Sequence, residues 1–206
     1  MVIDTDSMAK LMPFHCFYEP EAELADLLAA FAATRQRSFL EIGTHKGFTS
    51  AAIAVSFPHA RIVTIDLPDP QSTQWNPLPA QEVGAAHRAL GVGSRIEQRL
   101  MDSALLWQLA GRGETYDMVF VDGDHSPDAV LRDLVLAADL LEKTAGKILA
   151  HDYTAPGEAV RPPWTLGVQQ AVDRFLAIRP FALHRLSGLL AVLEPSPGEQ
   201  GNGGRP

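Results

Sequence analysis

The sequence predicts an α/β fold with a doubly wound, mostly parallel seven-stranded sheet that ends in a C-terminal antiparallel hairpin. Five short apolar segments alternate with segments whose apolar residues recur at helical spacing. Two more strand-like segments follow, separated only by Ser187 and Gly188, which is a hairpin signal. The chain has 206 residues, of which 46% are hydrophobic. It can therefore bury one sizeable core, and wholesale disorder is excluded.

The first half of the sheet is expected to follow an opening helix. Leu24, Leu27, Leu28 and Phe31 recur at helical spacing and predict a helix over 19–34. The elements expected next are a strand at 38–42, a helix at 47–56, a strand at 61–66, a helix at about 80–91 and a strand at 95–100. The segment 67–79 holds four prolines and is expected to be a loop.

The second half continues the alternation with a helix at 103–111 and a strand at 116–122. Ser126 and Pro127 predict the start of another helix, because a hydroxyl can cap free amides and proline suits the first turn. We expect Gly146 to end that helix. The remaining expected elements are a strand at 147–150, a helix through Val168, Val172 and Phe175, and hairpin strands at 181–186 and 189–193.

Domain organisation and composition narrow the class of protein. We expect an N-terminal helical segment at 1–35, one domain at 36–194 and a disordered tail at 195–206, where proline, glycine and serine dominate. The formal net charge of -8 argues against a nucleic-acid partner. No apolar run approaches the roughly 20 residues of a membrane span, and a single cysteine, Cys16, excludes an internal disulfide. A soluble, cytoplasmic protein with a small-molecule partner is expected.

Candidate site residues follow the strands, because ligands of an open parallel sheet bind beyond the carboxyl ends of its strands. Gly43 and Gly47 after the first strand would let the backbone turn and approach a ligand closely. Their spacing differs from the G-x-G-x-x-G of dinucleotide-binding proteins. Glu41, just before them, would repel a pyrophosphate and suit a ligand with positive charge. Asp66 closes the second strand, where an acid can accept both hydroxyls of a ribose.

Three further strand ends carry polar residues. Asp102 and Ser103 follow the third strand and are expected to contact the edge of a heterocycle. The fourth strand ends in Val121-Asp122-Gly123-Asp124-His125, and the fifth ends in Ala150-His151-Asp152-Tyr153.

Taken in order, these motifs resemble class I S-adenosylmethionine-dependent methyltransferases. Glu41, Gly43, Gly47, Asp66 and the segment 120–126 carry the resemblance. The region from Asp122 to 172 is similar to a bacterial group of small-molecule O-methyltransferases, of the methyltransferase family 24 type, which includes sugar and macrolide enzymes. The resemblance covers about 36–194 and implies a Rossmann-like sheet whose last strand is antiparallel.

The resemblance also implies roles for individual residues. The residues expected at the S-adenosylmethionine site are Glu41, Gly43, Thr44, Gly47, Thr49, Ser50, Asp66, Asp102, Ser103, Asp122 and His125. Catalytic roles fall on Asp122, His151 and Asp152, and the same three are the candidate ligands of Mg²⁺ or another divalent cation. Catechol-type relatives have Asn where Tyr153 stands, and macrolide-sugar relatives have a Glu-Asp pair in place of His151-Asp152. For His151, a general base, a metal ligand and a hydrogen-bonding residue all stay open.

The expected function is methyl transfer to a hydroxyl of a sugar, phenol or natural product, with metal assistance as one version. A non-catalytic adenosyl-cofactor-binding protein is the first alternative. A nicotinamide-dependent oxidoreductase is the second, and the missing G-x-G and Glu41 disfavour it. Acids at both the fourth and the fifth strand end favour an enzyme over a binding protein. The expected partner is a small-molecule acceptor, with neither nucleic acid nor membrane, and a homodimer is the candidate assembly.

Overall fold

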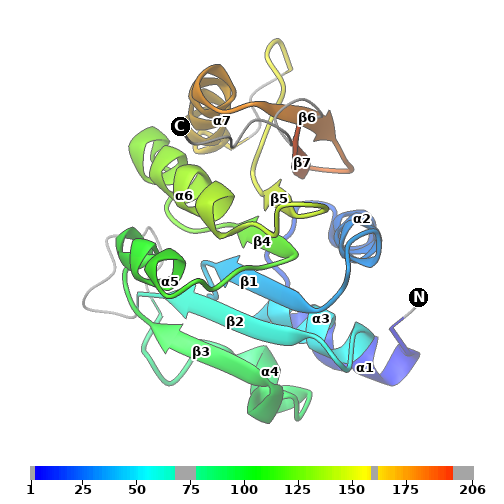
Figure 1. Ribbon diagram of the computed structural model, residues 1–206. Coiled ribbons are helices and arrows are strands. Elements are labelled where there is room, and N and C mark those ends of the chain that lie inside the picture. The colour runs from blue at the N-terminus through cyan, green and yellow to red at the C-terminus, as the bar shows by residue number, and fades with distance from the viewer. Residues whose placement is uncertain (1–2, 68–77, 159–161, 197–206) are drawn as a thin grey trace.

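The computed structural model describes residues 3–67, 78–158 and 162–196. Within these residues seven strands form one sheet in the order β3-β2-β1-β4-β5-β7-β6 (Figure 1). The first five strands run parallel, and β7 is antiparallel to both of its neighbours. The strands are β1 (Ser38–Ile42), β2 (Arg61–Asp66), β3 (Ile96–Leu100), β4 (Met118–Val121), β5 (Lys147–Ala150), β6 (Phe181–Arg185) and β7 (Ala191–Pro195). The predicted fold class is confirmed.

Helices cover both faces of the sheet (Figure 1). One face carries α1 (Thr5–Leu11), α2 (Pro20–Ala32), α3 (Phe48–Ser56) and α4 (Ala85–Ala89). The other face carries α5 (Trp107–Gly111), α6 (Pro127–Leu140) and α7 (Thr165–Ile178). Three short 3-10 turns complete the described elements: η1 (Met12–Phe14), η2 (Gly93–Arg95) and η3 (Ser103–Leu105).

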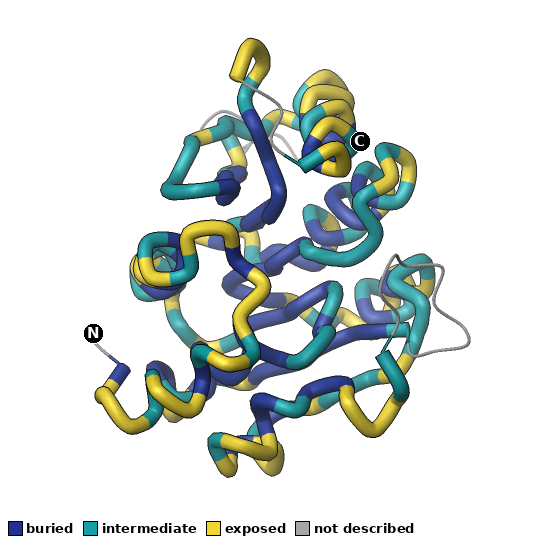
Figure 2. The backbone as a smooth tube through the Cα atoms, turned by 180° about the vertical axis from the view of Figure 1, so that it is seen from behind, coloured by how far each residue is buried: buried dark blue, intermediate teal, exposed yellow. Residues whose placement is uncertain are grey.

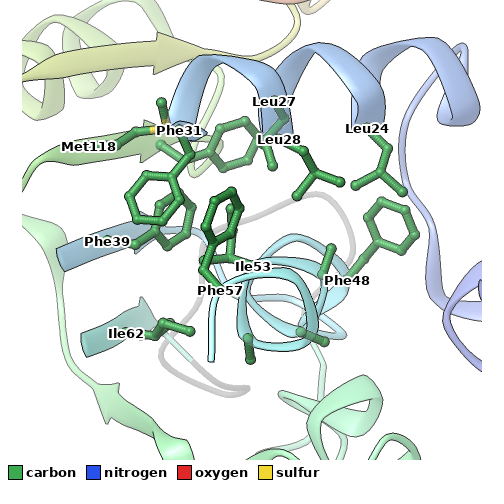
Figure 3. Close-up of a cluster of buried hydrophobic side chains, with 14 of the residues drawn as sticks. Leu24, Leu27, Leu28, Phe31, Phe39, Phe48, Ile53, Phe57, Ile62 and Met118 are labelled. Carbon is green, nitrogen blue, oxygen red and sulfur yellow. The ribbon is translucent and has the colours of Figure 1, made fainter. Parts of the chain in front are cut away.

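The strands are apolar on both sides because each face is covered. Along β1, Phe39 packs under α2 and α3 while Leu40 packs under the opposite helices. The first of these layers is drawn in Figure 3, where Phe31 from α2 meets Phe39 with ring centroids 5.7 Å apart and Phe57 at 4.7 Å. Seen from behind in Figure 2, the strands form the buried centre, and exposed residues lie on the helices and connections around it.

The order of the strands places the site. The chain moves outward from β1 to β2 and β3, and then returns to the other side of β1 with β4 and β5. A crevice forms at the carboxyl ends of the strands where this reversal occurs, between β1 and β4. Gly43 follows β1 and Asp122 follows β4, so the reversal brings the two predicted motifs together.

Several predicted boundaries are wrong, and local packing explains them. The helix expected at 80–91 is limited to α4, because Gly84 with φ +69° interrupts the helical run. The helix expected at 103–111 is divided into η3 and α5. The strand expected at 116–122 is shorter, although Tyr116 makes a single bridge to Leu141. Leu141 is extended, so α6 ends at Leu140 rather than at Gly146.

Two turn predictions are also corrected. Among the described residues the Ser126 side chain makes no capping hydrogen bond; the backbone N–H of Ser126 donates to the carboxylate of Asp124. The hairpin exists, but its connection spans 186–190 rather than two residues, because Leu190 is drawn into the core. α1 lies within the N-terminal helical segment expected at 1–35, where the sequence predicts one particular helix, at 19–34. Nearly all of the proline-rich segment 67–79 and of the tail 195–206 lies outside the described residues.

Candidate active site

A cavity of about 1060 Å³ opens at the carboxyl ends of the central strands. A smaller cavity of about 120 Å³ adjoins it and shares Gly43, Asp66, Gly123 and Asp124 with it. The described lining of the larger cavity includes four aspartates and neither lysine nor arginine, so it suits a ligand with positive charge. The lining residues are Cys16, Gly43, His45, Asp66, Asp122, Gly123, Asp124, His125, Ser126, His151, Asp152, Pro163 and Trp164.

The loop after β1 is held against β2 by its backbone. The N–H groups of Gly43 and Thr44 both donate to the carbonyl of Ile65, at 2.9 and 3.2 Å. The N–H of His45 donates to the carboxylate of Asp66. Gly43 has φ +95°, and a Cβ there would lie 2.0 Å from the carbonyl oxygen of Asp122. Glycine is therefore required where the two halves of the site meet.

Buried polar groups support this loop from below. Glu41 is 1% exposed, and its Oε2 has no hydrogen-bond partner in the part of the chain that the structure describes. Burial raises the pKa of Glu41 well above its ordinary value, although hydrogen bonding with Ser50 opposes this. The Ser50 hydroxyl lies 2.7 Å from Nε2 of His87. Burial lowers the pKa of His87 to about 4, so this imidazole is neutral near pH 7.

Some of the predicted cofactor residues line a cavity, and the others do not. The large cavity is lined by Gly43, Asp66, Asp122 and His125. The adjoining cavity is lined by Asp102 and Ser103, and Arg132 donates a hydrogen bond to the Ser103 hydroxyl there at 2.9 Å. The remaining predicted residues lie within or beneath the loop and are absent from the described lining of both cavities: Glu41, Thr44, Gly47, Thr49 and Ser50.

Two histidines and two aspartates converge at the ends of β4 and β5. Nδ1 of His151 lies 3.1 Å from Oδ1 of Asp122 and 3.5 Å from Oδ2 of Asp152. Nε2 of His125 lies 2.9 Å from Oδ2 of Asp152 and 3.6 Å from Oδ1 of Asp122. Asp152 has φ +57°, a left-handed conformation that aspartate tolerates better than most residues. Such strain is common at functional sites.

The charges of this cluster stabilise one another. Burial by itself would lower the pKa of His151, but Asp122 and hydrogen bonds to Asp122, Asp152 and Glu23 raise it well above its ordinary value. Burial also opposes the charged form of His125, yet Asp122 and Asp152 raise its pKa to about 10. Both aspartates have lowered pKa values: burial would raise them, and the neighbouring histidines outweigh that effect.

The two histidines differ in access. His151 is 4% exposed, and its second nitrogen, Nε2, lies 3.0 Å from Oε2 of Glu23. Both ring nitrogens of His151 therefore face carboxylates, which leaves neither nitrogen free to accept a proton from an acceptor molecule. The His125 side chain is 34% exposed in the cavity, and Trp164 lies beside it with ring centroids 6.4 Å apart.

Glu23 is the site-related residue that sequence reasoning missed. It lies on the apolar side of α2, one position before Leu24 and four before Leu27, and it is 0% exposed. A charged residue on an otherwise apolar helix face was the available signal, because such a group is seldom buried without a partner. Its partner, His151, is 128 residues away in the sequence.

The cluster also offers a set of metal ligands. One donor atom each from Asp122, His151 and Asp152 lies within 4.8 Å of the others. Glu23 holds Nε2 of His151, so Nδ1 is turned toward the two carboxylates. Histidines that bind metals commonly have their other nitrogen held by a carboxylate in this way. The geometry therefore fits the three ligands that the sequence predicts.

No helix among the described residues combines the length and apolar character needed to cross a membrane.

None of the curated proteins matches the chain significantly. Several solved structures have a similar fold. TomG from Streptomyces achromogenes, an O-methyltransferase involved in tomaymycin synthesis and solved with SAM, has a TM-score of 0.67 and 21% identity over 95% of this chain and 92% of its own.

Two further structures have a TM-score of 0.65. The O-methyltransferase from Bacillus cereus in complex with SAH is 15% identical over 94% of this chain and 91% of its own. The SAH-bound methyltransferase PaMTH1 from Podospora anserina is 19% identical over 94% of this chain and 89% of its own. The family model described as a methyltransferase domain matches residues 40–153, which is more than half of the chain. The chain belongs to this methyltransferase-domain family.

Proposed function

We propose that this methyltransferase uses S-adenosylmethionine and transfers the methyl group to a hydroxyl oxygen of a small molecule. One observation carries the proposal: the glycine loop after β1, Asp66 after β2 and the Asp122–His125–Asp152 cluster all open on one acidic cavity. Each of the three similar structures reported above contains SAM or SAH, and two of them are O-methyltransferases by name.

The cofactor is proposed to lie across the two adjoining cavities. Asp66 would accept the ribose hydroxyls, and Asp102 and Ser103 would contact the adenine from the smaller cavity. The methionine end would then lie above Glu41, which is buried beneath the loop and whose Oε2 has no hydrogen-bond partner among the described residues. S-adenosylmethionine supplies a methyl group on a positively charged sulfur, and the acidic lining favours that charge.

His125 is the proposed general base, in place of His151, for which a general base was one of three roles left open by the sequence. It is the histidine of the cluster that reaches the cavity from a partly exposed position, and its Nε2 lies 2.9 Å from Oδ2 of Asp152. The acceptor hydroxyl would give its proton to His125 as the oxygen forms its bond to the methyl carbon and the carbon–sulfur bond breaks, with the electron pair staying on sulfur. A bound cation in the cavity would lower the pKa of His125 and make its neutral form available.

A divalent cation is proposed as an assistant at the same place. Asp122, Asp152 and Nδ1 of His151 would hold it. Such an ion would lower the pKa of the acceptor hydroxyl. A donor set that includes an imidazole favours Mn²⁺, Fe²⁺ or Zn²⁺ over Mg²⁺, which prefers oxygen ligands.

Two measurements test the proposed function. Calorimetric titration with S-adenosylmethionine and S-adenosylhomocysteine should give dissociation constants in the micromolar range. Incubation with panels of phenols, sugars and natural-product alcohols should release S-adenosylhomocysteine in step with a methylated oxygen. Failure of both compounds to bind would overturn the proposed cofactor. Tight binding without turnover on any acceptor would favour the non-catalytic alternative.

We propose residues 36–194 as the methyltransferase domain, a homodimer as the assembly and the cytoplasm as the location. The homodimer is supported by large apolar side chains exposed at and just after the end of the edge strand β3, namely Leu100, Leu105 and Trp107. Light scattering of the purified protein tests the dimer, and cell fractionation tests the location.

A further inference from the structure

Glu23 is an ionisable side chain that is buried on an otherwise apolar face of a helix. Its helix, α2, packs an apolar face onto the sheet through Leu24, Leu27 and Phe31 (Figure 3). A carboxylate on the same face loses its hydration completely, which costs several kcal/mol unless partners replace the water. Leucine at this position would serve packing without that cost, so the carboxylate calls for another explanation.

Three separate segments supply the partners of Glu23. Oε1 accepts hydrogen bonds from the N–H groups of Glu19 at 3.0 Å and Leu189 at 3.2 Å. Oε2 faces Nε2 of His151 at 3.0 Å. Gly188 leaves the space for this arrangement, because a Cβ there would lie 2.0 Å from Oε1. The carboxylate is thus fixed from the start of α2 and from the β6–β7 connection, and it has one oxygen left for His151.

This contact determines which way the His151 ring is turned. With Nε2 held by Glu23, Nδ1 is directed at Asp122, 3.1 Å away, and toward Asp152 at 3.5 Å. Phe17 packs against the ring with centroids 4.9 Å apart and the planes 32° from parallel, which limits its rotation. Glu23 does not belong to the described lining of the cavity, so any effect on an acceptor passes through His151 and Asp122.

We propose that Glu23 is a positioning residue, which fixes the ring of His151 and thereby the carboxylate of Asp122 for methyl transfer. The proposal rests on the proposed function for its catalytic consequence. The positioning role is the same whether Nδ1 of His151 donates a hydrogen bond to Asp122 or faces a cation. In either case Nε2 carries a proton and donates it in a hydrogen bond to Glu23. The proposal also makes the segment 1–35 part of the active site of the domain proposed at 36–194.

The substitution Glu23→Gln tests the proposal with almost no change of shape. Oε1 must still accept from two backbone N–H groups, so the new amide NH₂ has to take the place of Oε2 and face Nε2 of His151. Nε2 can then no longer carry a proton, and the ring is left with a single proton, on Nδ1. Nitrogen-15 NMR of histidine-labelled protein reports this change directly, through the couplings of the two ring nitrogens of His151. The signals are assigned with a His151→Gln variant.

We expect kcat of the Glu23→Gln variant to fall about 10- to 100-fold, while the KM and dissociation constant of S-adenosylmethionine stay within threefold of wild type. Glu23→Ala should lose at least as much. The matched control is Glu21→Gln, which removes the same charge from the same helix at an exposed position and should behave as wild type. A fall in kcat with unchanged cofactor affinity indicates a positioning role, because a general loss of structure would lower both.

The proposal is overturned if the Glu23→Gln variant keeps its kcat within twofold, or if cofactor affinity and kcat fall together. Wild-type protein provides a test that needs no variant to fold: Nε2 of His151 must be protonated, and an unprotonated Nε2 overturns the proposal. If wild-type protein neither binds the cofactor nor turns over, the proposed function fails, whereas the NMR result still decides whether Glu23 sets the proton on His151.

Discussion

Gly43 and Asp122 meet backbone to backbone at the carboxyl ends of β1 and β4. A Cβ on Gly43 would lie 2.0 Å from the Asp122 carbonyl oxygen and 2.5 Å from its carbonyl carbon, closer than any real contact. The same glycine has φ +95°, a conformation that side chains strongly disfavour. The loop proposed to hold the cofactor and the segment proposed to carry the catalytic aspartate are therefore in direct contact.

We expect Gly43→Ala to destabilise the protein by about 3 kcal/mol or more, because both backbone strain and a clash with main-chain atoms must be relieved. Cofactor affinity should fall with it. Gly91→Ala is the control: Gly91 has φ +68°, but no atom of the described residues lies within 4 Å of its Cβ position, so the variant should lose only about 1 kcal/mol. Chemical denaturation measures both variants. Equal losses in the two would show that the contact with Asp122 is unimportant.

Asp66 provides a test of the proposed ribose contact. Its carboxylate already accepts from the N–H of His45 and lines both cavities. Asp66→Asn should weaken S-adenosylmethionine binding about 10- to 100-fold, because hydrogen bonds to a charged group contribute roughly 1.5–3 kcal/mol. Asp128→Asn, at an exposed position on α6, should bind like wild type. Calorimetry decides, and unchanged affinity of the Asp66 variant would place the ribose elsewhere.

His125 should be essential for turnover and dispensable for cofactor binding. Removing a general base typically lowers kcat by about 10²- to 10⁴-fold, so we expect a loss in this range for His125→Asn. The wild-type rate should rise with pH as His125 loses its proton, and the variant should lack that rise. The exposed His59→Asn is the control. A His125 variant with a wild-type pH profile would exclude this histidine as the base.

The lowered pKa of His87 predicts how the free energy of unfolding depends on pH. Its folded pKa is lowered to about 4 by burial, whereas an unfolded histidine titrates near pH 6.5. Between these values the unfolded chain takes up a proton that the folded chain does not, so stability falls as pH is lowered from 6.5 to 4. The contribution is about 3 kcal/mol at most. Unfolding free energies of wild type and His87→Gln, measured across this range, should converge toward pH 4; parallel curves would contradict the prediction.

Metal preference tests the cluster of Asp122, His151 and Asp152. We expect Mn²⁺ or Zn²⁺ to bind more tightly than Mg²⁺, because one donor is an imidazole nitrogen. Asp152→Asn should weaken the binding at least about tenfold, and Asp128→Asn should leave it unchanged. Titration of chelator-treated protein with each ion measures this. No binding by wild type would mean that the cluster holds its charges without a metal, and a preference for Mg²⁺ would contradict the role of His151 as a ligand.

The strands of the sheet, and several cavity residues that follow them, could be predicted from local sequence pattern. β1, β2 and β5 begin and end where their apolar runs predict, because a strand covered on both faces reads as a continuous apolar segment. Asp66, Asp122, His151 and Asp152 could be placed at one rim because the carboxyl ends of parallel strands share an edge. These conclusions depend on local pattern and on a general rule of topology.

Tertiary contacts distinguish His125 from His151 in exposure and in hydrogen-bond partners. His125 and His151 both follow strands and both lie next to aspartates, so their sequence contexts do not separate them. The difference comes from Glu23, which approaches His151 from α2 through a contact 128 residues away in the chain. Burial and hydrogen bonding depend on such distant contacts, and they fix the charge and the orientation of each ring. For this reason the chemistry of the site could be predicted from the sequence, while the role of each residue could not.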